Sequence, residues 1–426
     1  MKTIDVNENI HVHHIEMSKL KTTSISVCLH RPLTHDEASY NALLSSVLKQ
    51  SSRLCKNREL TARYLENLYG ATMGSTVLKM GEDQLIYFDC ETISDRFAPN
   101  GEKLVEGLIK LVMSELFEPV TDRGTFLEDV VAHEKKTLKE KIESLINDKR
   151  SYAMLRCQEE TARGTEYAVY RLGTKESLEK ITPRTLFEHY RKIIVSSVID
   201  IYICGDADIE AAARTIESYI HGIQFVKAER PKTEIITRDF TEINSVCEEM
   251  EVNQGKLAVG FITNIRPQDK DYPALMVMNS VFGAGTHSKL FANVREKLSL
   301  AYYAGSVLEK YKGMMTVNAG IEPKNYQKAY DEILAQLDEI KKGNISEYEL
   351  ESSIITIVNM YKSYYDDQRA MASFCLSNEI MGIKTDLEEM IEKIKAVTVD
   401  DVVRAAGHVQ TDTVYFLKGV GGNADE

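Results

Sequence analysis

Short apolar runs predict β-strands in both halves of the chain. In the N-terminal half, residues 24–30 (SISVCLH) and 200–204 (DIYIC) are rich in β-branched and aliphatic side chains. In the C-terminal half, residues 256–262 (KLAVGFI) and 412–417 (DTVYFL) have the same character. Runs of this length between polar segments are typical of buried strands, so each half is expected to contain a sheet.

Longer segments carry apolar residues at every third or fourth position and predict helices. One extends from Phe126 to about Glu160, and another covers Glu102–Phe117 and is ended by Pro119. Their counterparts in the second half are Asp331–Ile340 and a segment from Ser346 to about Ile380. Strands joined by hairpins, with pairs of helices between them, are typical of an α+β fold rather than a doubly wound parallel sheet.

The order of these elements repeats along the chain. Tyr40-Asn-Ala-Leu43 follows the first strand, and Tyr272-Pro-Ala-Leu275 follows the strand at 256–262. Later in each half, residues 75–79 (STVLK) and 305–309 (GSVLE) lead into a hairpin. The hairpin turns are expected at Gly81-Glu82-Asp83 and at Lys312-Gly313.

This repeat predicts two homologous domains, residues 1–225 and residues 251–426. Each is expected to be a mainly antiparallel, twisted sheet packed against helices. The connection between them, residues 226–250, is charged and contains Pro231, as in an extended linker.

Composition excludes several classes of function. The chain has 426 residues and a formal charge of −13, which argues against binding to a nucleic-acid backbone. No apolar run approaches the roughly 20 residues of a membrane-spanning helix, and the first ten residues are polar, unlike a signal peptide. The seven cysteines form no CxxC pair, which favours a reducing compartment. These features together predict a cytoplasmic protein.

Common catalytic motifs are missing from the sequence. Gly283-Ala-Gly285 lacks the third glycine of a dinucleotide-binding loop, and neither GxxxxGK[ST] nor GxSxG occurs. His11-Val-His13-His14 is the one histidine cluster; on a strand His11 and His13 would share a face while His14 points away. We interpret this cluster as an exposed strand end. No HExxH or HxxEH is present, so no helix supplies a zinc-binding histidine pair.

The second half nevertheless carries a recognisable signature. It consists of Tyr272-Pro-Ala-Leu275, residues 279–288 (NSVFGAGTHS), Leu290-Phe291 and residues 295–302 (REKLSLAY). This signature resembles the C-terminal domain of the insulinase/pitrilysin-type zinc peptidases, the superfamily that includes the mitochondrial processing peptidase. The resemblance covers essentially the whole chain, because the domain repeat and the order of helices also agree.

The resemblance implies a pair of α+β domains that forms half of a clam-shell around a peptide chamber. In the family, the zinc site uses HxxEH on the first long helix and a distal glutamate on a later helix. The two histidines and the distal glutamate bind the metal, and the glutamate of the motif is the general base.

At the zinc site this chain departs from the family pattern. Alignment of residues 40–52 (YNALLSSVLKQSS) with the family's helix puts Ala42, Ser45 and Ser46 at the positions of His, Glu and His. An alanine offers no ligand atom, and two hydroxyls do not replace an imidazole and a general base. The distal ligand falls at Glu140 or Lys141, with Lys141 in the better register, and Glu134 matches another family carboxylate or simply lies on a solvated helix face. We therefore expect no metal and no cofactor in this chain.

A second functional element of the family is present. In the family an arginine, and a tyrosine seven residues later, reach the substrate at the zinc site; here Arg295 and Tyr302 have that spacing, and Tyr303 competes with Tyr302. A guanidinium and a phenol can donate hydrogen bonds to the scissile carbonyl and its developing oxyanion. Alternatively, Arg295 forms an ion pair with Glu296 at a helix end while Tyr302 begins a buried strand.

The resemblance thus favours a catalytically incomplete subunit of a heterodimeric metallopeptidase. This subunit would be inactive alone, would complete the chamber and bind peptide through Arg295 and Tyr302, and would pair with a homologous HxxEH-bearing chain that supplies zinc. The alternative is a non-enzymatic peptide-binding or scaffold subunit of a larger complex. A third possibility is an active peptidase whose ligands are unrecognised, such as the cluster at residues 11–14 or His35 with Asp36 and Glu37.

Overall fold

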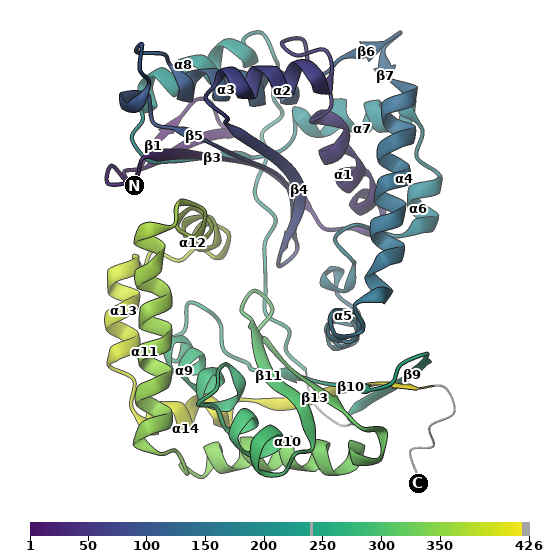
Figure 1. Cartoon of the computed structure of the whole chain (residues 1–426), viewed down its shortest axis with the longest axis vertical. Helices are drawn as coiled ribbons and strands as arrows, with labels where there is room; N and C mark the ends of the chain where they lie inside the picture. The colour runs from purple at the N-terminus through teal and green to yellow at the C-terminus, as the bar shows by residue number, and fades with distance from the viewer. Residues whose placement is uncertain (239–241, 420–426) are drawn as a thin grey trace. The chain divides into compact units, whose positions relative to one another are not determined.

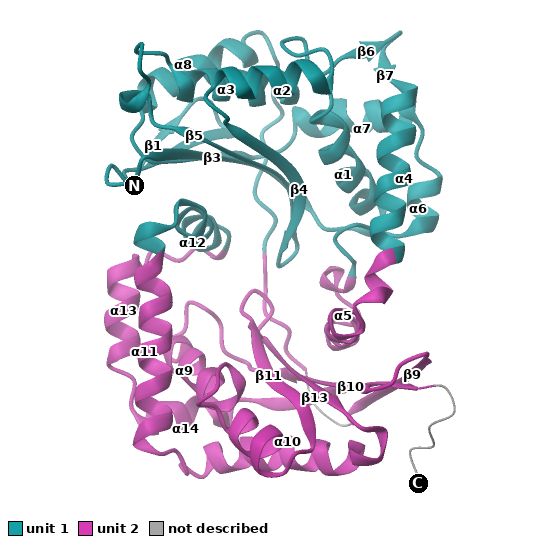
Figure 2. Cartoon of the chain, viewed as in Figure 1, with its two compact units in different colours: residues 1–143, 169–232, 364–380 teal, residues 144–168, 233–363, 381–426 magenta. Residues whose placement is uncertain are grey.

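The computed structural model describes residues 1–238 and 242–419, which form two compact units (Figures 1 and 2). Each unit contains a segment from the other half of the sequence. Unit 1 comprises residues 1–143, 169–232 and 364–380, and unit 2 comprises residues 144–168, 233–363 and 381–426. In the described part of the chain, no helix is both long and apolar enough to cross a membrane.

The sheet of unit 1 has the strand order β1-β2-β8-β3-β5-β4. All neighbouring strands are antiparallel except β2 and β8, which are parallel. The strands are β1 (Lys2–Asp5), β2 (Ile10–Ile15), β3 (Thr22–Pro32), β4 (Thr72–Met80), β5 (Asp83–Ile93) and β8 (Ile199–Cys204). A separate short pair is formed by β6 (Thr121–Asp122) and β7 (Thr125–Phe126).

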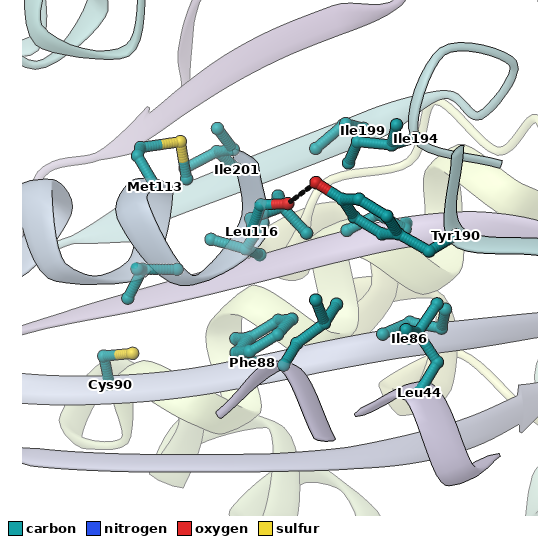
Figure 3. Packing of buried hydrophobic residues seen from close by; sticks show 14 of the residues in the cluster. Leu44, Ile86, Phe88, Cys90, Met113, Leu116, Tyr190, Ile194, Ile199 and Ile201 are labelled. Carbon is teal, nitrogen blue, oxygen red and sulfur yellow. Dashed lines mark hydrogen bonds between the residues drawn. The ribbon is translucent and has the colours of Figure 1, made fainter. Parts of the chain in front are cut away.

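Helices pack against one face of this sheet and bury the core of unit 1 (Figure 3). Phe88 of β5 and Ile201 of β8 are fully or almost fully buried there, and the Tyr190 hydroxyl donates a hydrogen bond of 2.9 Å to the carbonyl of Leu116. The helices of the unit are α1 (His35–Leu48), α2 (Arg58–Asn67), α3 (Leu104–Phe117), α4 (Glu128–Ser144, whose last residue belongs to unit 2), α6 (Lys175–Glu179), α7 (Pro183–Ile194), α8 (Ile209–Ile220) and α12 (Gln368–Met381, likewise).

The sheet of unit 2 repeats this topology. Its order is β11-β12-β10-β13-β9, and only β13 and β9 are parallel. The strands are β9 (Asn244–Met250), β10 (Gly255–Ile262), β11 (Ala301–Glu309), β12 (Met314–Ile321) and β13 (Gln410–Gly419). Read from the other edge, this is the order β2-β8-β3-β5-β4 of unit 1, which adds β1 at its edge. The two sheets therefore share five strands in the same spatial order.

Unit 2 contains one helix from the N-terminal half of the sequence. This helix, α5, packs against β10 and β13 through Ala153 and Cys157, which share a small core with Ala258 and Tyr415. The helices of the unit are α5 (Lys149–Thr161), α9 (Tyr272–Gly283), α10 (Tyr326–Lys341), α11 (Glu347–Ser363), α13 (Leu387–Lys395) and α14 (Val399–Gly407), with a π-helical turn at Leu290–Lys297.

The predictions of the two longest helices are wrong in one respect: each predicted helix is broken into two helices. The segment from Phe126 to Glu160 consists of α4, a short 3-10 turn and α5, and the Asp148 side chain accepts hydrogen bonds from the first amides of α5. The segment from Ser346 to Ile380 breaks in the same way before α12, where Asp367 accepts from the Ala370 amide. Such caps begin a new helix, and apolar periodicity does not reveal them.

The connection expected at 226–250 is only partly extended. Residues 222–238 carry no helix or strand, and residues 239–241 lie outside the described residues. The last seven residues form β9, which pairs in parallel with β13 at the edge of the sheet. This strand was missed because its residues alternate between half-buried and exposed and include two glutamates.

Candidate functional site

The three positions that replace the zinc motif lie along α1, and the helix holds them with local hydrogen bonds. Ala42 is 2% exposed and belongs to the core of unit 1. The buried Ser45 hydroxyl donates to the Ala42 carbonyl at 2.9 Å, and the Ser45 carbonyl accepts from Ser75 of β4 at 2.7 Å. Ser46 is half-buried, and its carbonyl accepts from the Gln50 side chain at 3.1 Å. The Ala42 and Ser45 side chains are therefore engaged in the core and the helix.

A cavity of about 480 Å³ lies beyond the last turn of α1 and is bounded by the segment after α1, the start of α2 and the first turns of α4. Gln50 and Ser51 line it from the α1 side, and His133 and Glu134 line it from α4. Glu134 is 8% exposed, so it is not on a solvated helix face. Glu140 and Lys141 are exposed farther along α4 and do not line the cavity.

The donor set of this region does not fit a zinc ion. Zinc needs imidazole, thiolate or carboxylate ligands in a tetrahedral arrangement. The α1 positions supply a methyl group and two hydroxyls, and the residue at the preferred distal position is a lysine. Across residues 1–238 and 242–419, no group of three or more His, Cys, Asp or Glu side chains is placed to hold a metal ion.

Arg295 lies on an irregular helical turn in unit 2. The turn Leu290–Lys297 is π-helical, a distortion often found at functional sites. The Arg295 guanidinium lies 4.7 Å from the centre of the Phe291 ring and 3.4 Å from Glu296, and the side chain remains 42% exposed. The expected local ion pair therefore exists, and the guanidinium is also accessible.

Tyr302 lies at a β-bulge directly after this turn. The register between β11 and β12 shifts between Ala301 and Tyr303, and Tyr302 is 61% exposed. It does not begin a buried strand, as the alternative interpretation required. Bulges re-aim side chains and occur next to active sites. Tyr303 is held differently: it is half-buried, and its ring lies 4.2 Å from the Arg150 guanidinium.

A short connection fixes the two segments that carry Arg295 and Tyr302. The Leu298 amide donates to the Asn293 carbonyl and the Leu300 amide to the Val294 carbonyl, each at 3.0 Å. Ser299 adopts a left-handed conformation with φ of 50°. The π-helical turn and the bulge therefore form one unit of local structure.

Comparison with known proteins identifies the family. The profile described as "Peptidase M16 inactive domain" matches residues 180–356. A Bacillus subtilis protein called "Probable inactive metalloprotease YmfF" is 33% identical over 419 residues, which cover 96% of each chain. The chain belongs to the M16, insulinase-type, peptidase family. Its zinc site is an inactive one.

Two further proteins are similar to this chain over more than half of its length. The "Uncharacterized zinc protease YmxG" of Bacillus subtilis is 26% identical over 249 residues, covering 57% of this chain and 58% of that protein. The crystal structure of a conserved protein from Enterococcus faecalis V583 superposes with a TM-score of 0.91 at 28% identity and covers 99% of both chains. A solved peptidase M16 inactive domain from Pseudomonas fluorescens superposes with a TM-score of 0.79 at 17% identity and covers 98% of both chains, so the fold is shared along essentially the whole chain.

The histidine cluster is not an exposed strand end, and this prediction was wrong. His13 is 3% exposed, and its Nε2 lies 3.1 Å from Asp200 Oδ1. Asp200 also receives two hydrogen bonds from Arg230 and lies 2.9 Å from His30 Nε2. His14 points elsewhere, as predicted, and its Nε2 contacts the Gly205 carbonyl at 3.0 Å.

This buried network within the M16 chain extends to Asp83 and is electrostatically coupled. His30 Nδ1 lies 2.5 Å from Asp83 Oδ2, and both side chains are inaccessible to solvent. Burial lowers the pKa of His30, but the charges and hydrogen bonds of Asp83 and Asp200 outweigh it and raise the pKa to about 9. Asp200 is buried as well, yet His13, His30 and Arg230 hold its pKa below the ordinary value. The partners come from distant segments, so the sequence offered no local signal for them.

Proposed function

We propose that this chain is the non-zinc subunit of a heterodimeric M16 metallopeptidase. On its own it has no peptidase activity. A homologous HxxEH-bearing subunit supplies the zinc, the general base and the attacking water, and this chain contributes Arg295 and Tyr302 to the peptide-binding surface. The complex is expected in the cytoplasm.

One observation carries the proposal: the zinc-binding residues of the family are replaced in this chain, whereas its arginine and tyrosine are present. The zinc positions Ala42 and Ser45 are buried and bonded within their own unit. In contrast, Arg295 and Tyr302 are exposed on distorted backbone. A side chain kept only for packing has no need of a bulge that leaves it largely exposed, with its phenol next to the Glu322 carboxylate.

Peptide binding also has a suitable backbone surface. Strand β4 is an edge strand of the unit 1 sheet, and most of its residues are half-buried or exposed. An edge strand offers unpaired amides and carbonyls to an extended peptide, with little dependence on its sequence. The bond between Ser75 and the Ser45 carbonyl fixes β4 to α1.

The proposal is tested with a reconstituted pair of this chain and the zinc-bearing subunit. Arg295→Ala is expected to reduce peptide turnover at least about tenfold, the lower range for the loss of one donor to an oxyanion. Arg404→Ala is the matched control, because Arg404 is also a half-exposed arginine of unit 2 engaged with acidic neighbours. Assembly should be unchanged in both variants. A turnover equal to wild type in Arg295→Ala would contradict the role of this residue.

Tyr302→Phe tests the phenol in the same assay. It removes one hydroxyl and should lower turnover in the same direction, whereas Tyr348→Phe, another strongly exposed tyrosine of unit 2, should have no effect. If neither Arg295 nor Tyr302 affects turnover, and the chain binds peptide or other proteins without a zinc partner, the scaffold function is favoured instead.

A further inference from the structure

A pair of positively charged side chains in unit 2 lacks an acidic partner. Arg150, at the start of α5, uses its Nε to bond the Asn318 side chain at 3.2 Å. Lys256 of β10 bonds the Gln254 side chain at 2.5 Å. Among the described residues no carboxylate forms an ion pair with either side chain. In the same unit Arg163 and Arg238, by contrast, both form ion pairs with the buried Asp412.

Both cations lie against the same aromatic ring. The Arg150 guanidinium is 4.2 Å from the centre of the Tyr303 ring, and the Lys256 ammonium is 5.7 Å from it. Interaction with the negative face of a ring partly stabilises each cation but does not neutralise it. Burial lowers the pKa of Lys256, and the nearby charge of Arg150 lowers it further. The two like charges therefore lie against one ring, where a bound anion would interact favourably with both.

The sheet is shaped to hold this arrangement. Tyr303 pairs with Gly320 of β12, and Gly320 pairs with Lys256 of β10. A Cβ atom at Gly320 would clash with the Tyr303 ring, so a glycine is needed for the ring to lie on the sheet. Asn318, two residues earlier on β12, is 5% exposed and fixes the Arg150 fork from the same face.

An acidic group close to the pair, Asp148, is already engaged. Asp148 caps α5: it accepts from the amides of Arg150 and Ser151 at 3.1 Å and from the Ser151 hydroxyl at 2.6 Å. Its charge acts on Arg150, Lys256 and Tyr303 at longer range, without a direct ion pair to either cation. The terminal nitrogens of Arg150 stay available, and Arg150 is exposed.

We infer that Arg150 and Lys256, supported by Tyr303, form a carboxylate-binding site for a peptide. An arginine fork binds a carboxylate through two parallel hydrogen bonds, and the lysine adds a point charge. The carboxylate belongs either to an acidic side chain or to the C-terminus of the peptide. The inference rests on the proposed function in taking a peptide as the ligand, and it adds a preference for anionic peptides.

The site is tested by calorimetric titration of the full chain alone with three N-acetylated peptides of one sequence. The first has a central glutamine and a C-terminal amide, the second a central glutamate and an amide, and the third a central glutamine and a free C-terminus. At least one charged peptide should bind roughly tenfold tighter than the neutral one, the effect of one charge-assisted pair. Whichever charged peptide shows the gain identifies the source of the carboxylate.

Variants assign the preference to the site. Arg150→Gln and Lys256→Gln should each remove most of the tenfold gain while leaving the affinity for the neutral peptide unchanged. Arg266→Gln changes the net charge equally at an exposed arginine of unit 2 and should keep the gain. Equal affinities of the wild type for all three peptides would overturn the inference, as would a gain that survives in both site variants. No zinc subunit or turnover enters this measurement, so its outcome is independent of the Arg295 test.

Discussion

At the scale of single residues, buried ionisable groups in unit 1 determine how stability depends on pH. His30 is held between Asp83 and Asp200, and its pKa is raised to about 9. Because the folded state holds this proton more tightly than the unfolded state, the stabilisation is complete below the unfolded pKa of about 6.5 and is lost as pH rises through about 9. A carboxylate stabilised in its ionised form behaves in the opposite way, because its contribution to stability is lost as pH falls.

His30→Gln should therefore destabilise unit 1 most strongly below about pH 6.5, where this stabilisation is complete. Removing one partner of a buried charge network typically costs about 3–5 kcal/mol, because the remaining charge is left uncompensated. Urea unfolding at pH 6 and pH 9 measures both effects. The wild type should lose up to about 3 kcal/mol more than the variant between these values. Parallel pH profiles for the two proteins would show that His30 does not carry the proton.

Substitution of Glu115 on α3 should stabilise the protein, whereas substitution of His30 should destabilise it. Neither oxygen of its buried carboxyl group has a hydrogen-bond partner among the described residues, and burial raises its pKa to about 9. Replacing an unpaired buried acid by an apolar side chain of similar shape relieves its desolvation cost. Glu115→Met is expected to raise the free energy of unfolding at pH 7 by about 1–3 kcal/mol. The control Glu106→Met, at a half-buried position of the same helix, loses only a surface ion pair with Lys110 and should change it by less than about 0.5 kcal/mol. A destabilised Glu115→Met would contradict the assignment.

At the scale of elements, the sequence pattern predicts the apolar strands and most of the helices. It does not predict the polar strands or the points where a long helix breaks. Strands β3 and β10 were found because their residues are buried almost throughout. The polar strand β9 and the break before α5 were missed, since the first depends on pairing with β13 and the second on the side chain of Asp148. Arg295 and Tyr302 were predicted only from the resemblance; the bulge that exposes Tyr302 has no signature in the sequence.

The helix break gives a prediction at this scale. Asp148→Ala removes the cap of α5 and should cost about 1 kcal/mol, whereas Asp148→Asn preserves the acceptor and should cost little. Thermal or urea unfolding of the two variants measures the difference. Equal stabilities would show that packing of α5 on the unit 2 sheet, rather than the cap, determines where the helix begins.

At the scale of the whole molecule, the exchange of segments makes the two halves of the sequence interdependent. Unit 2 requires α5 from the first half, and unit 1 requires α12 from the second, where Gln368 donates to the carbonyls of Thr22 and Cys204. Cutting the chain at the predicted boundary, residues 226–250, would therefore leave part of each unit on the other fragment. Neither half alone contains all the segments of its unit.

Fragments 1–238 and 242–426 test this interdependence. Each alone should unfold without a cooperative transition and expose apolar surface to a hydrophobic dye, because a segment of its unit is missing and another is unpartnered. Co-expression of the two fragments should restore cooperative unfolding. A fragment 1–238 that unfolds as cooperatively as the intact chain would show that α12 is dispensable for unit 1.

The central claim is that this M16 chain supports peptide cleavage only through a zinc-bearing partner. The most direct measurement is peptide turnover, with zinc content, as this chain is titrated into its HxxEH-bearing homologue purified from the same host. We predict no turnover by this chain alone, and an increase on mixing that reaches a plateau at a one-to-one ratio, with all zinc in the partner. Turnover that does not change on mixing, or stoichiometric zinc in this chain with cleavage by it alone, would contradict the account.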